Sequence, residues 1–127
     1  MAMLKFAHLI TDGKPIDIYN NGKLRRDWTH IDDIVEGFVR AVEKPLGYEV
    51  INLGNGLPTS LLAFVELLEK EFGQTAQKNM LPMQEGDVFE TYADTRKAKE
   101  LLGFESKITL EEGVRSFVDW YKDFYKK

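Results

Sequence analysis

The chain has 127 residues, 43% of them apolar and 30% charged, which is enough for one compact domain with a buried core. Its net charge of −4 argues against a surface for nucleic acid or for an anionic membrane, and no apolar run approaches the roughly 20 residues of a membrane span. Without cysteine, and with only two histidines, the chain offers no disulfide, no thiol nucleophile and no multi-histidine metal site. This composition fits a cytoplasmic protein without a metal centre.

The first predicted element is a helix that starts without any start signal. Residues 2–11 are rich in apolar side chains, and Asp12, Gly13 and Pro15 follow as stop signals. No capping residue precedes the helix. We therefore expect the chain to be cut from a longer protein.

Residues 16–29 have the pattern of a β-hairpin. Residues 16–19 alternate between apolar and polar side chains, Asn21-Gly22 is a strong hairpin-turn signal, and residues 24–29 return as a second strand. A two-residue turn would place Asp17 opposite Arg26 across the two strands.

A helix is predicted to follow, from Asp32 or Asp33 to about Glu43. Either aspartate can cap its N-terminus, and Asp33 and Glu36 have capping-box spacing. The two adjacent carboxylates could instead act as general acid and base, but helix caps are far commoner. The spacing of the apolar residues predicts a buried stripe made of Ile34, Val35, Phe38, Val39 and Val42.

The rest of the chain alternates between short strands and helices. Capping residues and glycine stops mark the helices, and a Thr109–Glu112 capping box opens the last one. These signals predict one α/β domain over residues 1–127, with short strands and about five helices. After Glu43 the predicted elements are a strand at 49–53, a glycine turn at 54–56, a helix at 59–72, a strand at 78–83, a loop at 82–88, an extended segment at 91–93, a helix at 95–102 and a helix from 109 to the C-terminus.

Two motifs suggest a dinucleotide enzyme but lack the required context. Gly54-Asn55-Gly56 follows a predicted strand, yet Thr59 stands where the third glycine of a dinucleotide turn belongs, so a tight turn explains the glycines as well. Tyr19 and Lys23 have the Tyr-x-x-x-Lys spacing of short-chain dehydrogenases, but that spacing brings the side chains together only on a helix. The predicted hairpin turn separates them.

Three side chains are candidates for holding a nucleotide. Arg26 ends a strand beside a helix N-terminus, where a guanidinium can bind phosphate, although it could equally pair with Asp17. Asp87, in Glu85-Gly86-Asp87, either shapes a turn or accepts hydrogen bonds from sugar hydroxyls. Tyr19 is either a hairpin side chain or a flat face for a nucleobase.

Four motifs in one order resemble a known family. The chain is similar to the C-terminal part of NAD-dependent nucleotide-sugar epimerases and dehydratases, the extended short-chain dehydrogenases, and most of all to UDP-glucuronate epimerases. The resemblance covers essentially the whole chain. The motifs are Arg-Asp-Trp-Thr-His-Ile-Asp-Asp at 26–33, Tyr-Glu-Val-Ile-Asn-Leu-Gly-Asn at 48–55, Met-Gln-Glu-Gly-Asp-Val at 83–88 and Thr-Tyr-Ala-Asp at 91–94.

The resemblance implies that this part of the enzyme holds the UDP group of a UDP-sugar. It places Arg26 on the pyrophosphate, Asp87 on the ribose hydroxyls and the strand from Asp17 to Tyr19 beside the uracil. Related galactose epimerases carry a second phosphate-binding arginine where this chain has Gln84. The NAD-binding turn and the catalytic Tyr-x-x-x-Lys pair belong to the N-terminal half of the family. We therefore expect NAD in the intact enzyme, and neither a cofactor nor a catalytic residue in this chain.

Several functions stay open at this point. The resemblance implies a nucleotide-sugar 4-epimerase that is inactive as this fragment, with a sugar 4,6-dehydratase as the alternative. A stand-alone nucleotide-sugar binder or an oligomerisation module belongs to a different class. The resemblance also implies that the strand at Val50–Leu53 extends the large sheet of the N-terminal half. Without that half its edge is unpaired, and we expect the free edge to favour self-association.

Overall fold

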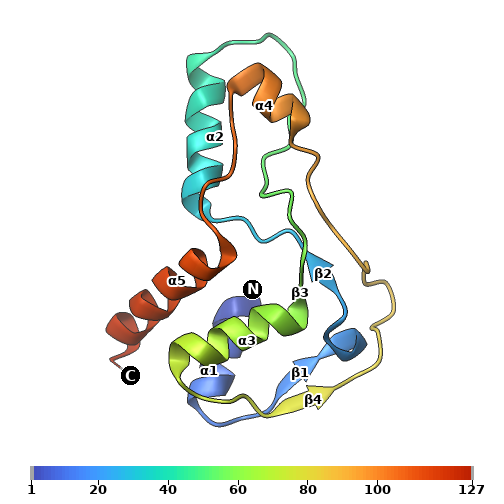
Figure 1. Ribbon diagram of the computed structural model, residues 1–127, viewed down its shortest axis with the longest axis vertical. Coiled ribbons are helices and arrows are strands. Elements are labelled where there is room, and N and C mark those ends of the chain that lie inside the picture. Colours follow the sequence, from blue (N-terminus) through green and yellow to red (C-terminus); the bar gives the residue numbers. More distant parts are fainter. Residues whose placement is uncertain (1, 127) are drawn as a thin grey trace.

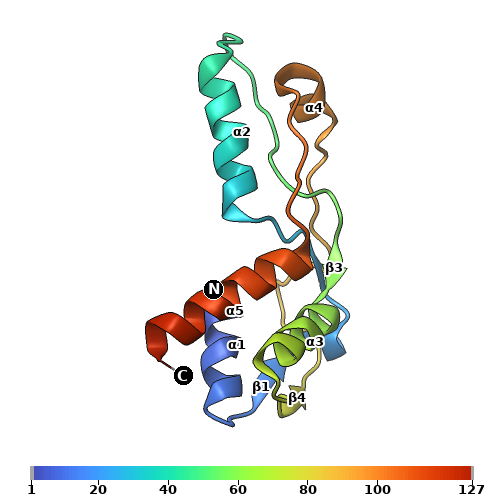
Figure 2. The same ribbon diagram turned by 60° about the vertical axis from the view of Figure 1, so that its left-hand side comes forward.

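The computed structural model describes residues 2–126 and has a lower lobe around α1, α3 and α5 and an upper lobe around α2 and α4 (Figures 1 and 2). The prediction of a small α/β fold with about five helices is confirmed for these residues. The elements are α1 (Ala2–Thr11), β1 (Ile16–Ile18), the 3₁₀ turn η1 (Tyr19–Gly22), β2 (Arg25–Arg26), α2 (Ile31–Glu43), β3 (Thr59–Ser60), α3 (Leu61–Phe72), β4 (Lys78–Met80), α4 (Arg96–Leu102) and α5 (Leu110–Tyr125).

The main core lies in the lower lobe, where α1, α3 and α5 pack over the β1–β4 pair. β1 and β4 run parallel, with Ile16 opposite Lys78. Phe64 of α3 is fully buried and stacks on Trp28, with the ring centroids 4.1 Å apart. The core consists of Phe6, Ile10, Ile16, Ile18, Phe64, Val65, Leu68, Ala76, Val114 and Val118.

The hairpin expected at residues 16–29 is wrong. Asn20 and Asn21 take left-handed backbone angles, with φ of 49° each, and form η1 instead of a two-residue turn. The Asn21 N–H donates to the Leu81 carbonyl, and the Leu81 N–H donates to Ile18, so the turn continues along the chain that follows β4. β1 therefore pairs with β4, and β2 pairs antiparallel with β3.

The expected caps of α2 are also wrong. His30 is the N-cap, and its Nδ1 accepts a hydrogen bond of 3.2 Å from the Asp32 N–H. Asp33 lies inside the first turn with only 2% of its surface exposed, and its carboxylate accepts hydrogen bonds from residues 106–108. A carboxylate committed to another segment cannot serve as the cap of its own helix.

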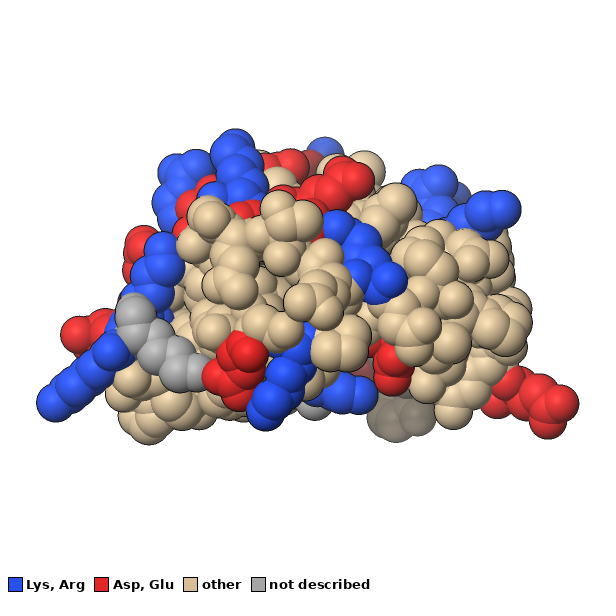
Figure 3. Space-filling model, turned by 90° about the horizontal axis from the view of Figure 1, so that it is seen from below, with Lys and Arg blue, Asp and Glu red and all other residues tan. Residues whose placement is uncertain are grey.

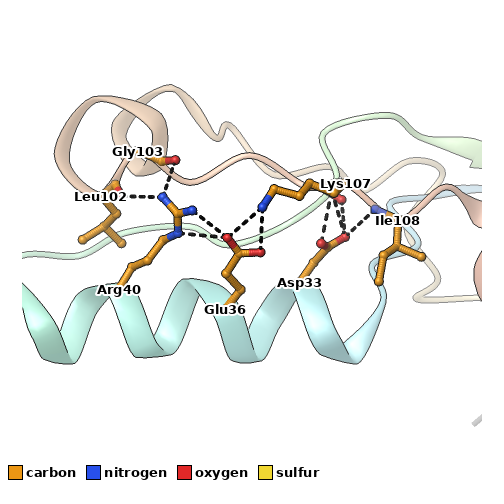
Figure 4. A network of polar contacts seen from close by, with 8 residues as sticks. Asp33, Glu36, Arg40, Leu102, Gly103, Lys107 and Ile108 are labelled. Atoms are coloured by element: carbon orange, nitrogen blue, oxygen red, sulfur yellow. Dashed lines mark hydrogen bonds and ion pairs between the residues drawn. The ribbon is translucent and has the colours of Figure 1, made fainter.

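The apolar stripe of α2 points outward, contrary to the prediction. Phe38 and Val42 are 67% and 76% exposed. The opposite, polar side of the helix faces the chain after α4, where Glu36 and Arg40 bond to residues 102–107 (Figure 4). Because the polar side of α2 contacts the chain after α4, its apolar side faces solvent in the part of the chain that the structure describes.

The strand expected at residues 49–53 does not form. Within the described residues no strand runs beside this segment to complete a ladder, and Val50 is 68% exposed.

Helix signals in the second half of the chain are largely confirmed. Gly73 and Gly103 end α3 and α4 in left-handed conformation, and Thr109 with Glu112 forms the predicted capping box of α5. The helix α3 begins at Leu61, after the N-cap Ser60, rather than at Thr59. Across residues 2–126, the helices are too short or too polar to cross a membrane. On the face formed by the β1–β4 end, acidic and basic side chains are interspersed around an uncharged centre (Figure 3).

Candidate functional site

β2 brings the loop at 85–88 to its arginines. The Arg25 N–H donates to the Phe89 carbonyl at 2.9 Å, and the Thr91 N–H donates to the Arg25 carbonyl at 3.2 Å. Residues 89–91 therefore run parallel to β2 on the side away from β3. The Arg25 side chain binds the two segments beside β2: it pairs with Glu90 at 2.9 Å and donates to the Pro58 carbonyl.

Arg26 and Asp87 form the polar centre of this region. Arg26 Nη2 lies 2.7 Å from Asp87 Oδ1, and the two side chains are 27% and 33% exposed. Arg26 Nη1 also donates to the carbonyl oxygens of Arg25 and Phe89, at 2.8 and 3.3 Å. The guanidinium is thus held in place while part of it stays open to solvent. A fixed guanidinium beside a carboxylate can bind a phosphate and a hydroxyl-bearing sugar next to each other.

Pairing of Arg26 with Asp17, one of the sequence alternatives, is wrong. Asp17 lies opposite Asn79 on β4 and accepts a hydrogen bond of 2.9 Å from Asn79 Nδ2. β1 pairs with β4 and β2 pairs with β3, so Asp17 and Arg26 are not partners across a strand pair, and Arg26 pairs with Asp87 instead.

The other predicted site residues lie around this pair on different elements. Gln84 is exposed, and its carbonyl accepts the Asp87 N–H at 3.2 Å, so Gln84 and Asp87 belong to one turn. Tyr19 is half-buried at the start of η1, two residues after Asp17. The structure brings Arg26, Asp87 and Gln84 together through one loop, and it places Asp17 and Tyr19 on the β1–η1 segment.

Sequence reasoning missed the role of Asp27. Its carboxylate accepts backbone N–H groups from Asn55, Gly56 and Ala93 at 2.9–3.1 Å. The Asn55 N–H is shared with Thr29 Oγ1 at 3.1 Å. The sequence offered one signal for this role: an acidic residue directly after Arg26, in a chain that also has a glycine turn whose N–H groups need acceptors.

The same hydrogen bonds distinguish the two interpretations of the glycine turn at 54–56, a dinucleotide-binding turn or a tight turn. Two of its N–H groups are already taken by Asp27 and are not free for the phosphates of a dinucleotide. The tight-turn interpretation therefore fits, and the residues present do not fit an NAD pyrophosphate at this turn.

Asp33 is closed off from a substrate, because it is 2% exposed and both of its carboxylate oxygens accept hydrogen bonds from residues 106–108. Burial raises the pKa of Asp33, but hydrogen bonds from Ser106, Ile108 and Lys107 more than offset this and hold it below the ordinary value of 3.8. A carboxyl group with a lowered pKa stays ionised and is a poor proton donor near neutral pH. Residues 2–126 contain no cluster of three or more metal-ligating side chains.

A cavity of about 570 Å³ lies away from the Arg26–Asp87 pair, between α5 and the start of α2. Its lining is mainly apolar and includes Trp28, Phe117 and Trp120, with His30 and Thr109 among the polar groups.

Comparisons with known proteins place this geometry in a family. A family model described as GDP-mannose 4,6 dehydratase matches residues 2–117. An uncharacterized protein of Methanocaldococcus jannaschii is 49% identical over 121 residues, which are 95% of this chain and 37% of the relative. A UDP-glucuronate 4-epimerase of Thermodesulfobacterium geofontis is 43% identical over 124 residues, which are 97% of this chain and 38% of the relative.

A solved structure agrees with the fold. The UDP-glucuronic acid 4-epimerase of Bacillus cereus, in complex with UDP-glucuronic acid and NAD, matches with a TM-score of 0.91 at 35% identity, covering 98% of this chain and 40% of that one. The chain thus spans less than half the length of the relatives it matches. The chain belongs to the GDP-mannose 4,6-dehydratase family of nucleotide-sugar epimerases and dehydratases, the extended short-chain dehydrogenases, and it corresponds to their C-terminal part.

Proposed function

We propose that residues 1–127 form the substrate-binding domain of a nucleotide-sugar 4-epimerase and hold the UDP group of a UDP-sugar. The single observation that carries this proposal is the Arg26–Asp87 pair, which is fixed by the backbone around β2 and partly open to solvent. Relatives named as UDP-glucuronate 4-epimerases, one of them solved with UDP-glucuronic acid, support UDP-sugar as the ligand class. The cysteine-free composition fits the cytoplasmic setting expected above.

The pair is suited to exchange its internal contact for two contacts with UDP. A pyrophosphate replaces the Asp87 carboxylate on the Arg26 guanidinium, and ribose hydroxyls replace the guanidinium on Asp87. Each side chain then keeps a partner of the type it has in the free chain. Tyr19 and Asp17 lie on the segment assigned to the uracil, and Gln84 lies in the same turn as Asp87.

The chemistry belongs to the intact enzyme rather than to this domain. NAD, held outside this chain, would take up a hydride from the sugar and return it. This domain contributes binding energy at the nucleotide end, which fixes the position of a reacting carbon at the sugar end. We expect this chain to bind no NAD and to be inactive alone.

Substitution of Arg26 tests the proposal directly. Arg26→Ala is expected to weaken UDP binding by about 1.5–3 kcal/mol, the range for a hydrogen bond to a charged group, which is roughly 10- to 150-fold in affinity. Isothermal titration calorimetry with UDP measures the change. Arg96→Ala is the matched control, because Arg96 also forms an arginine–aspartate pair, with Asp94, but its side chain is 90% exposed. Equal affinities in the wild type and Arg26→Ala would contradict the proposal.

Two other functions have one observation each in their favour. A 4,6-dehydratase is favoured by the description of the matching family model. An oligomerisation module is favoured by the outward apolar side of α2, whose exposed members include Val35, Phe38 and Val42. Product analysis of the intact enzyme separates the first, since a dehydratase releases water and an epimerase does not.

We also propose that the isolated chain self-associates. The outward side of α2 exposes apolar side chains, and Val50, in a segment without a strand partner among residues 2–126, is 68% exposed as well. A second copy is the partner available in a solution of this chain alone.

A further inference from the structure

We infer that Asp27 is a positioning residue: it sets the register of residues 87–93 against β2 and so places Asp87 at Arg26. The inference rests on the UDP-binding role proposed for that pair. The Asp27 carboxylate accepts N–H groups of Asn55, Gly56 and Ala93, so it acts on Asp87 through the backbone of the segment that carries Asp87.

A hydrogen-bond ladder beside β2 includes Asp27. Bonds occur at alternate residues of the parallel segment: the Phe89 carbonyl, then the Thr91 N–H, then the Ala93 N–H. The Arg25 backbone donates to Phe89 and accepts from Thr91. The Asp27 carboxylate accepts the third bond, from the Ala93 N–H, at 2.9 Å. The carboxylate thus extends the ladder where β2 has ended.

The same carboxylate also holds the segment on the other side of β2. The N–H groups of Asn55 and Gly56, just before β3, donate to Asp27 at 3.1 and 2.9 Å. One side chain therefore fastens three chain segments: the one after β2, the one before β3 and the one that leads back to Asp87.

The segments held by Asp27 approach each other closely at Gly54. A Cβ added at this glycine would lie 2.5 Å from the Ala93 Cβ and 3.0 Å from Asp27 Oδ2. Real Cβ atoms do not tolerate the first distance, so any side chain at Gly54 forces these segments apart. The residue type at this position is explained by the contact between the two segments.

The chemistry requires a carboxylate rather than a polar side chain in general. Asp27 uses both oxygens, Oδ1 for Asn55 and Oδ2 for Gly56 and Ala93. An asparagine offers one oxygen, and its NH₂ group would face a backbone donor with another donor. Asp27→Asn therefore keeps the size and shape of the side chain but removes at least one of its three hydrogen bonds.

The upper lobe supplies a matched control. Asp33 is likewise a carboxylate that accepts backbone N–H groups, from Lys107 and Ile108 at 3.1 Å each. It lies in α2 and holds the chain after α4 (Figure 4), and its hydrogen bonds go to residues 106–108 rather than to the segment that carries Asp87. Asp33→Asn removes the same type of interaction without touching the segment at 87–93.

The test measures UDP affinity by calorimetry for the wild type, Asp27→Asn and Asp33→Asn, each well below its unfolding temperature. We expect Asp27→Asn to weaken binding by about tenfold, and Asp33→Asn to lower the unfolding temperature with UDP affinity unchanged. Equal UDP affinities in all three proteins would overturn the inference, and so would an equal loss in both variants. If Asp27→Asn does not fold, Gly54→Ala is measured instead, because it keeps the carboxylate and displaces the same segments.

A second readout separates this inference from the proposed function. Amide hydrogen exchange in the free chain is expected to speed up at Ala93, Asp87 and Val88 in Asp27→Asn, but not in Asp33→Asn. If the wild type binds no UDP while these amides respond, the proposed function fails and the positioning of the segment stands. Unchanged exchange at these amides contradicts the positioning role whatever the UDP result.

Discussion

The two lobes of this protein are held together in opposite ways. The lower lobe buries apolar side chains from three helices and a strand, with Phe64 and Val114 at 0% exposure. The upper lobe has a small buried cluster of Ala98, Leu102 and Phe104, and its main helix is attached by its polar side.

The difference shows what an amphipathic pattern can and cannot predict. Helices α2 and α5 have equally clear apolar stripes, and in α5 the stripe is largely buried: Val118 is 1% exposed. In α2 the charged residues Asp33, Glu36 and Arg40 bind the neighbouring segment (Figure 4), and the stripe faces solvent. Periodicity identifies the apolar face of a helix, but the position of its partner is not encoded in that pattern.

The largest effect should come from a cavity in the lower lobe. Phe64→Ala removes a buried ring that stacks on Trp28, and we expect the free energy of unfolding to fall by about 3–5 kcal/mol. Urea unfolding measures the loss. Phe38→Ala is the matched control on the upper lobe, measured at a concentration at which the chain is monomeric, because the ring is 67% exposed and the expected change is within about 0.5 kcal/mol. Similar losses in both variants would break the contrast between the lobes.

The attachment of the upper lobe should depend on pH through Asp33. Hydrogen bonds keep its folded pKa below the ordinary value of 3.8 despite burial. The unfolded state therefore binds the proton more readily, so Asp33 stabilises the fold above pH 3.8, and this contribution is lost as pH falls through the folded pKa.

Asp33→Asn tests this directly. We expect it to lower stability at pH 7 by about 1–3 kcal/mol and to flatten the fall of stability below pH 4. Urea midpoints at several pH values measure both. An acid limb as steep as in the wild type would show that Asp33 is not responsible for it.

Self-association should depend on the apolar side of α2 and not on the lower lobe. Phe38→Asp places a charge at the centre of the exposed stripe, and we expect it to shift the chain toward monomer in sedimentation velocity at low micromolar concentration. Phe124→Asp is the control, since Phe124 is similarly exposed, at 64%, on α5. A clean monomer in the wild type would remove the self-association proposal.

The smallest effect should come from the capping box of α5. Thr109 Oγ1 accepts the Glu112 N–H at 3.2 Å, and Glu112 accepts the Thr109 N–H at 2.8 Å. Thr109→Ala is expected to cost about 1 kcal/mol in thermal or urea unfolding, and Thr75→Ala in an exposed loop much less. No change in Thr109→Ala would mean that packing alone fixes the start of α5.

Local signals predicted the elements well and their partners poorly. Gly73, Gly103 and the Thr109 capping box act within one turn of helix, so the residues alone were enough. The Asn21-Gly22 pair gave a hairpin signal, yet β1 found a parallel partner about 60 positions further along the chain. A turn motif carries no information about such a distant strand.

The candidate site shows the same limit. Arg26 and Asp87 were identified as candidates from their residue types and family motifs, but their direct contact became visible only in the fold. Asp27 was missed because its carboxylate binds three backbone N–H groups. Every residue except proline has such a group, so the residue types do not reveal which ones lie near Asp27.

The most direct test of the central claim is an NMR titration of the ¹⁵N-labelled chain, first with UDP and then with NAD. The account predicts saturable shifts at Tyr19, Arg26 and Asp87 with UDP, and none with NAD. Saturable shifts with NAD at the turn of residues 54–56, or no response to UDP at Arg26 and Asp87, would contradict it.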